Sequence, residues 1–260
     1  VVMAGRSSII SRGRLIVIPH ANNSAITDVD PERPGPDFIA LTSPSGERRF
    51  RYGSRRTKAQ HQGAPDPEKY RHPKSTEELA GPEARNLNRS YPGVVDGTLT
   101  QRMAHAILQL IKTEKASLAF DLHEAPPESR LAWMVVANPK NIDVAAVAVL
   151  ELEDQGLSMK LEPSSVTFRG LSHREWGDAT PALAFLFETP SPSMVNDTKG
   201  VDFVNDPRLP LSKRVGGHLL SFAAVLGAYN GEAKPGAAVT LIGLPSMADV
   251  EKAGVGALLK

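Results

Sequence analysis

The chain contains no cysteine, and this absence excludes two kinds of structure. Without cysteine there is no disulfide framework and no thiolate zinc site. Any transition metal bound by side chains would need histidine, aspartate or glutamate ligands. The compartment stays open, because a chain without cysteine fits a bacterial periplasmic protein and a cytoplasmic one equally well.

Long apolar runs and an excess of charge of one sign are also missing. No run approaches the roughly 20 residues of a membrane span. The 30 Lys and Arg residues nearly balance 29 Asp and Glu residues, so overall charge gives no argument for a nucleic-acid partner. Phosphate-loop motifs, Gly-x-Ser-x-Gly elbows and internal repeats are absent as well. What remains is an ordinary globular composition, 41% apolar over 260 residues.

Apolar runs alternate with helical patterns along most of the chain, which predicts an α/β fold. One domain over residues 1–230 is expected, with a mostly parallel or mixed twisted sheet and helices on both faces. The best helix, 98–115, begins with Thr98 and Gln101 at capping-box spacing. The C-terminal extension, 231–260, is predicted to hold a short strand near 239–242 and a short helix after Pro245. The other elements expected are strands at 14–20, 118–120, 131–137, 159–168 and 182–187, and helices at 142–155 and 211–229.

Residues 28–82 show no sustained periodicity and are rich in proline, glycine and charge. Between Gly46 and Lys74, nine Lys and Arg residues stand against three Asp and Glu residues. We interpret this segment as a long, basic, solvated loop inserted in the domain, of a length that is usually functional or disordered. A phosphate-binding role is an alternative, but Tyr52 and Tyr70 offer little aromatic surface for stacking on bases.

The stretch that most suggests a site is Ala116-Ser-Leu-Ala-Phe-Asp-Leu-His-Glu124, an apolar run that ends in polar side chains. Ligands of open α/β sheets bind at the carboxyl ends of the strands. There, His123 could ligate a metal while a neighbouring carboxylate orients its ring, or it could simply cap a strand. Glu188 follows the apolar run 182–187 in the same way, and partial burial would raise its pKa toward the range of a general base.

Two other polar stretches could contribute to a site. Arg85-Asn-Leu-Asn-Arg89 could bind a carboxylate through an arginine fork and an asparagine amide, or be a polar loop that bonds its own backbone. His173 and Glu175 are candidates for a second metal pair. The alternative, which we prefer, is that residues 170–177 form an ordinary loop. Two further histidines within predicted helices are interpreted as structural, namely His105 and His218.

Three of these stretches follow one another in a familiar order: Arg85 to Arg89 with Tyr91-Pro-Gly93, then Asp121-Leu-His123, then Phe187-Glu188. Their order and approximate spacing resemble the zinc carboxypeptidase superfamily, most closely its succinylglutamate desuccinylase/aspartoacylase branch. Residues 16–22, Ile-Val-Ile-Pro-His-Ala-Asn, also look like that branch. The resemblance covers roughly residues 1–190 and implies a zinc carboxypeptidase-like fold.

The resemblance also implies roles for individual residues. His123 would be a ligand of one zinc ion, and Glu188 would activate the water that attacks the substrate. Asn88 and Arg89 would clamp the substrate carboxylate, and Arg85 would polarise the scissile carbonyl. These roles would make the chain a hydrolase of an amide bond next to a carboxylate.

The sequence departs from this family at the other two zinc ligands, which the family takes from a His-x-x-Glu motif after its first strand. None of the seven histidines here has glutamate three residues later. The motif would stand near the Gly5–Arg6 junction, after an apolar run that we interpret as a strand. Only eight residues, 6–13, lead from there to the strand expected at 14–20, whereas a parallel crossover needs about 10–12. Either the two strands form a hairpin, or roughly 20–30 residues are missing and Gly5 and Arg6 are not covalently adjacent.

Two functional hypotheses follow from the sequence. The first is a zinc-dependent amide hydrolase that acts on an N-acyl amino acid or on a peptide C-terminus. The second is a catalytically inactive relative that uses Asn88 and Arg89 to bind carboxylates and holds no zinc, because a catalytic zinc needs three protein ligands. A third is a plain α/β interaction domain whose resemblance is accidental. The sequence does not choose the substrate or the oligomeric state.

Overall fold

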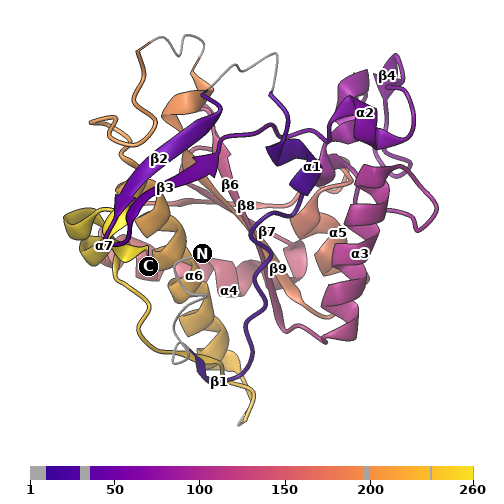
Figure 1. The fold of residues 1–260 in the computed structure, drawn as a ribbon. Coiled ribbons are helices and arrows are strands. Elements are labelled where there is room, and N and C mark those ends of the chain that lie inside the picture. The colour runs from indigo at the N-terminus through magenta and orange to yellow at the C-terminus, as the bar shows by residue number, and fades with distance from the viewer. Residues whose placement is uncertain (1–9, 30–35, 196–199, 235, 260) are drawn as a thin grey trace.

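The computed structural model describes residues 10–29, 36–195, 200–234 and 236–259 (Figure 1). Its centre is a four-stranded sheet in the order β6-β9-β7-β8. The strands are β6 Leu118–Ala125, β9 Leu183–Pro190, β7 Met134–Ala137 and β8 Lys160–Pro163. β6 is parallel to β9 and β7 is parallel to β8, while β7 and β9 are antiparallel. The prediction of an α/β fold with a mixed sheet is therefore confirmed.

Helices pack on both faces of this sheet, as Figure 1 shows. On one face the main core joins the sheet to α4 and α6 and contains the fully buried Phe185 and Phe187. On the other face a smaller core joins Ala119 and Ala184 to α3 and α5. The helix bounds are α3 Leu99–Thr113, α4 Ile142–Asp154, α5 Ser172–Ala179 and α6 Leu211–Glu232. None of the helices within the described ranges is long and apolar enough to cross a membrane.

The alternation of side chains along β6 and β9 decides which residues reach which face. The Phe120 ring lies 5.7 Å from the rings of both Phe185 and Phe187, measured between centroids, within the main core. His123 and Glu188, at odd spacing from these rings along their strands, therefore lie on the opposite face, toward α5. The sheet thus carries aromatic packing on one face and polar groups on the other.

Several expected elements form at their predicted places. Thr98 and Gln101 make both hydrogen bonds of the capping box at the start of α3. The C-terminal extension holds β10 (Thr240–Leu241) and α7 (Met247–Ala253), as expected. His218 is hydrogen-bonded to Thr189 Oγ1 (3.1 Å) on the α6 face, which agrees with a structural role.

The strand predicted over residues 14–20 does not form. Within the described residues, 14–18 have no regular structure, and Ile16, Val17 and Ile18 are 44%, 54% and 43% exposed. The nearest strand is the short β1 (Ile10–Arg12), which pairs with β10. β-Branched composition favours a strand only where a neighbouring strand can bond it, and 14–18 have no such neighbour in the described structure. The strand predicted at residues 1–5 and the Gly5–Arg6 junction lie outside the described residues.

The prediction of one long loop over residues 28–82 was also wrong. A hairpin of β2 (Phe38–Ser43) and β3 (Gly46–Arg51) forms there, with Arg49 and Arg51 over the Phe38 ring at 4.5 and 4.9 Å. The turn residues Ser43-Pro-Ser-Gly46, placed after the apolar run 38–41, were the signal for it. Three more short elements follow, namely α2 Ala59–Gln62, β4 Lys69–Tyr70 and β5 Leu79–Ala80.

Residues 172–179, expected as a loop in the segment 170–177, form the helix α5. No side chain of its own caps the helix. Instead the backbone N–H of Ser172 donates to Oδ1 of Asn88 at 2.7 Å, across 84 positions of sequence. A cap supplied from so far away leaves no local signal in the sequence, which explains the wrong prediction.

Candidate functional site

The candidate site lies at the carboxyl ends of the parallel strands β6 and β9. Their register places His123 directly opposite Glu188. Nδ1 of His123 lies 3.9 Å from Oε1 of Glu188. The structure thus brings together two residues that the sequence placed at the ends of separate apolar runs.

Asp121 holds the other side of the His123 ring. Nε2 of His123 lies 3.0 Å from Oδ2 of Asp121, two residues earlier on the same face of β6. Burial by itself would lower the pKa of His123, but the charge and hydrogen bond of Asp121, with Glu188, raise it to about 9. This shift of the His123 pKa favours the protonated form of its ring at neutral pH.

Glu188 is a nearly buried carboxyl group, with a side chain 10% exposed. Its Oε2 atom is buried and has no hydrogen-bond partner. Burial raises the pKa of Glu188 to about 7, helped by Asp121 and opposed by His123 and Arg89. A carboxylate with such a pKa can both take and return a proton near neutral pH.

Arg89 reaches this cluster from two short 3-10 helices, η1 (Gly81–Arg85) and η2 (Leu87–Arg89). Its guanidinium lies over the Phe168 ring, 4.9 Å from the centroid. Its Nε is buried without a hydrogen-bond partner, 3.7 Å from Oε2 of Glu83. The positive charge of Arg89 lowers the pKa of Glu188.

The backbone of Arg89 is fixed from two directions. Tyr70 Oη donates to the Arg89 carbonyl at 2.7 Å. Gly170, with φ of +85°, packs so closely that a Cβ there would lie 2.2 Å from the same carbonyl oxygen. Only glycine allows both this conformation and this approach. The position of Arg89 is therefore set by tertiary contacts from residues 70 and 170.

Asn88 and Arg85, the other two residues predicted to bind substrate, have different surroundings in the structure. Asn88 lies beside Arg89, but its Oδ1 accepts from Ser172, so its amide nitrogen is the part left for a substrate. Arg85 donates to both carboxylate oxygens of Asp66 (2.8 and 3.0 Å) and to the Thr57 carbonyl (2.6 Å). These bonds tie η1 to the loop before it and give Arg85 a structural partner.

His173 is a buried residue close to the candidate site. The sequence analysis considered it only for a separate metal pair with Glu175. Its imidazole is 4% exposed, and Nδ1 has no hydrogen-bond partner. Burial lowers the pKa of His173 to about 3, with Asp121 opposing and His123 and Arg89 adding to the shift. Glu175 instead binds Arg169 at 2.7 and 2.9 Å, so the two do not form a metal pair. The missed signal is the helical spacing of His173 and Trp176 on one face.

The residues described do not make up a zinc site. Across 10–29, 36–195, 200–234 and 236–259, no three His, Asp or Glu side chains are placed to hold a metal ion. His123 offers one nitrogen, Nδ1, since Nε2 is held by Asp121. A catalytic zinc needs three protein ligands, so these side chains would not hold one by themselves.

The chain was compared with protein-family models, with curated proteins and with solved structures. No match was found. The resemblance to the zinc carboxypeptidase superfamily therefore depends on the three short stretches around Arg89, His123 and Glu188 and on residues 16–22. The approach of His123 to Glu188 is a property of this structure, independent of any relative.

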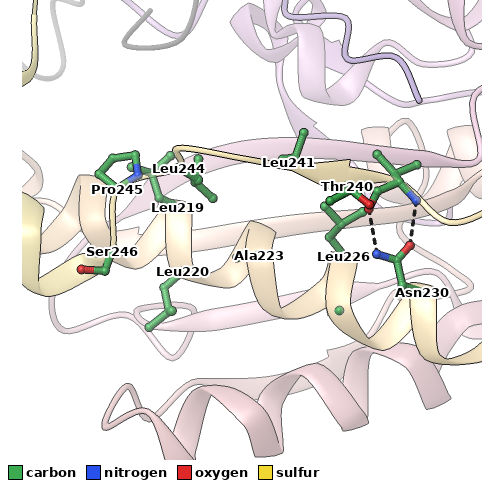
Figure 2. A pocket seen from close by; sticks show the side chains of 12 residues that line it. Leu219, Leu220, Ala223, Leu226, Asn230, Thr240, Leu241, Leu244, Pro245 and Ser246 are labelled. Atoms are coloured by element: carbon green, nitrogen blue, oxygen red, sulfur yellow. Dashed lines mark hydrogen bonds between the residues drawn. The ribbon is translucent and has the colours of Figure 1, made fainter. Parts of the chain in front are cut away.

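A separate groove of about 430 Å³ lies between α6 and residues 239–246 (Figure 2). Its walls are mostly apolar, with five leucines among the twelve lining residues. The Asn230 amide is bonded to the N–H and carbonyl of Val239. None of the described residues that line it is an acid, a histidine or a basic residue. α6 packs on the aromatic face of the sheet, so this groove is not part of the His123 site.

The raised pKa of His123 predicts a dependence of stability on pH. A histidine with a folded-state pKa above its unfolded value stabilises fully below pH 6.5 and loses that contribution as pH rises through about 9. We expect the free energy of unfolding to fall by roughly 1–3 kcal/mol between pH 6.5 and 9.5. Urea unfolding with a metal chelator present measures this fall. His123→Gln should show a clearly shallower fall, and equal slopes would contradict the prediction.

Proposed function

We propose that the chain is a hydrolase that cleaves an amide bond next to a carboxylate, in an N-acyl amino acid or at a peptide C-terminus. The observation that carries this proposal is the 3.9 Å approach of His123 to Glu188 at neighbouring parallel strand ends. The positive charge of Arg89 also lowers the pKa of Glu188. The proposal places the chain with the zinc carboxypeptidase superfamily, near its succinylglutamate desuccinylase/aspartoacylase branch. The zinc that this branch uses would need ligands besides His123.

Glu188 is the proposed general base. Its carboxylate would take a proton from the water that attacks the scissile carbonyl and would later give a proton to the leaving amine. The unpartnered Oε2 and the surrounding apolar strand support this role, because a desolvated carboxylate is a stronger base than one in water. The charges of His123 and Arg89 lower the pKa of Glu188 and so favour its ionised form.

Arg89 and Asn88 are the proposed anchor for the substrate carboxylate. The guanidinium lies over the Phe168 ring, and its Nη1 donates to the Asn88 carbonyl at 2.6 Å, so little conformational freedom remains to be lost on binding. Two parallel N–H donors from arginine would grip the carboxylate, and the Asn88 amide would add a third. This geometry would hold the neighbouring amide bond near Glu188.

A second candidate function is carboxylate binding without catalysis. The observation that favours it is the lack of a three-ligand metal group in the described part of the chain. In this case the site would bind the same compounds through Asn88 and Arg89 and leave them unchanged.

Zinc binding and turnover separate the two candidates. The chain is assayed for hydrolysis of N-acyl amino acids and short peptides with added zinc, and its zinc content is measured after dialysis. Hydrolysis that disappears with a chelator supports the hydrolase. If no compound is cleaved but N-acetyl amino acids bind in calorimetry, the binding function is correct and the hydrolase proposal fails.

Arg89→Lys should weaken substrate binding and change turnover little. Lysine keeps the positive charge but loses the planar fork that bonds two carboxylate oxygens. Losing one charged hydrogen bond of about 1.5–3 kcal/mol raises KM roughly 10- to 100-fold. Steady-state kinetics on the best substrate measures the effect. Arg85→Lys is the matched control, since Arg85 binds Asp66, and an equal rise of KM in that variant would contradict the assignment.

A further inference from the structure

Asp121 is a polar residue of the site to which neither the resemblance nor the proposed reaction assigns a role. It lies on β6 two residues before His123, on the same face of the sheet. Its Oδ2 is 3.0 Å from Nε2 of His123, within hydrogen-bond range. Its side chain is 23% exposed, so solvent screens this bond only in part.

We propose that Asp121 is a positioning residue that sets which nitrogen of His123 faces the reaction. Its pairing with Nε2 at 3.0 Å would fix the plane of the imidazole along β6. Nδ1 then points across to β9, where it lies 3.9 Å from Oε1 of Glu188. This inference rests on the proposed function, because it assumes that Glu188 and the cleft beside Nδ1 are where the substrate reacts.

Asp121 itself is held in place by neighbours on the other elements. The N-terminus of α5 lies beside it, and the Ser172 hydroxyl is near enough to lower the pKa of Asp121, although it forms no hydrogen bond of standard geometry. The charge of Asp121 also raises the pKa of Tyr91 and opposes the lowering of the pKa of His173. Nε2 of His123 lies within hydrogen-bond distance of this carboxylate, at 3.0 Å.

The spacing of Asp121 and His123 on β6 determines which nitrogen of the His123 ring Asp121 can reach. A carboxylate two positions away on a strand shares the face of the histidine but lies along the strand, not across it. The Asp121 bond therefore leaves the nitrogen that faces the neighbouring strand free. Glu124 cannot do this, because it lies on the opposite face and is paired with Arg214.

The test uses Asp121→Asn, with Asp178→Asn as the control. Asp178, on α5, is also a paired aspartate. It is bound to Arg174 of the same helix and to Asn138, and it is not paired with His123. The first measurement is the nitrogen-15 and proton spectrum of the His123 ring in protein labelled at histidine, assigned with His123→Gln. We expect the downfield Hε2 signal of His123 to be lost in Asp121→Asn and kept in Asp178→Asn, with unfolding midpoints showing that both variants are folded.

The second measurement is steady-state kinetics on the best substrate. Asp121→Asn should lower kcat roughly 10- to 100-fold with little change of KM, the range found when a carboxylate partner of a functional histidine is removed. Unchanged His123 ring signals would overturn the proposal, and so would an unchanged kcat with altered signals. If the parent chain hydrolyses nothing, the proposed function fails separately, and the ring signals alone decide whether Asp121 positions His123.

Discussion

Glu188→Gln should lower turnover by about 10²–10⁴-fold, the usual contribution of a general base, while KM changes little. Glutamine keeps the size of the side chain and its place at the end of β9 but cannot accept a proton. Removal of a buried group with a pKa of about 7 should not unfold the chain, because the amide needs less hydration than a carboxylate. Steady-state kinetics with added zinc on N-acyl amino acids and short peptides measures the effect.

Glu162→Gln is the matched control for this experiment. Glu162 also lies on a strand of the sheet, but on β8, where it pairs with Arg130. Turnover of this variant should stay within about twofold of the parent, as expected for a surface substitution away from the site. If Glu188→Gln keeps nearly full turnover on any substrate that the parent cleaves, Glu188 is not the base and the assignment of roles fails.

Phe185→Ala should be the most destabilising single change considered, at about 3–5 kcal/mol. The Phe185 ring is fully buried and stacks on Phe120 at 5.7 Å, inside the core that joins the sheet to α4 and α6. Truncation leaves a cavity that rigid strands on both sides cannot fill. Urea unfolding followed by circular dichroism gives the change in the free energy of unfolding.

Leu150→Ala provides the comparison for Phe185→Ala. Leu150 lies on α4 but is 64% exposed, so its loss should change stability by no more than about 0.5 kcal/mol. A loss below about 1 kcal/mol for Phe185→Ala would mean that the ring is not packed as described. Phe185→Leu should retain much of the stability, since a smaller part of the volume is removed.

Local sequence patterns predicted the helices and strands whose signals lie within a few residues of one another. The capping box at Thr98 predicted α3, and uninterrupted apolar runs predicted β6 and β9. Such signals act within a few residues, so a single sequence carries them. The strand ends that they defined were enough to select His123 and Glu188 as candidates.

Contacts between distant segments decided what the sequence could not show. α5 begins where Asn88 caps Ser172, and residues 14–18 have no neighbouring strand to bond in the described structure, so α5 was missed and a strand at 14–20 was wrongly expected. Local propensity is worth only about 1 kcal/mol or less per residue and gives way to such contacts.

For the candidate site too, the sequence supplied one part of the description and the tertiary structure the other. The sequence by itself shows that His123 and Glu188 each follow an apolar run. The composition of these runs predicts that both are buried strands of one sheet. Only the tertiary structure decided that β6 and β9 are neighbours in a register that places His123 opposite Glu188. It also decided that Asp121 holds Nε2, that Arg89 lies over Phe168, and that Arg85 binds Asp66. Strand order and side-chain direction arise from packing between segments far apart in the chain, and one sequence does not encode them locally.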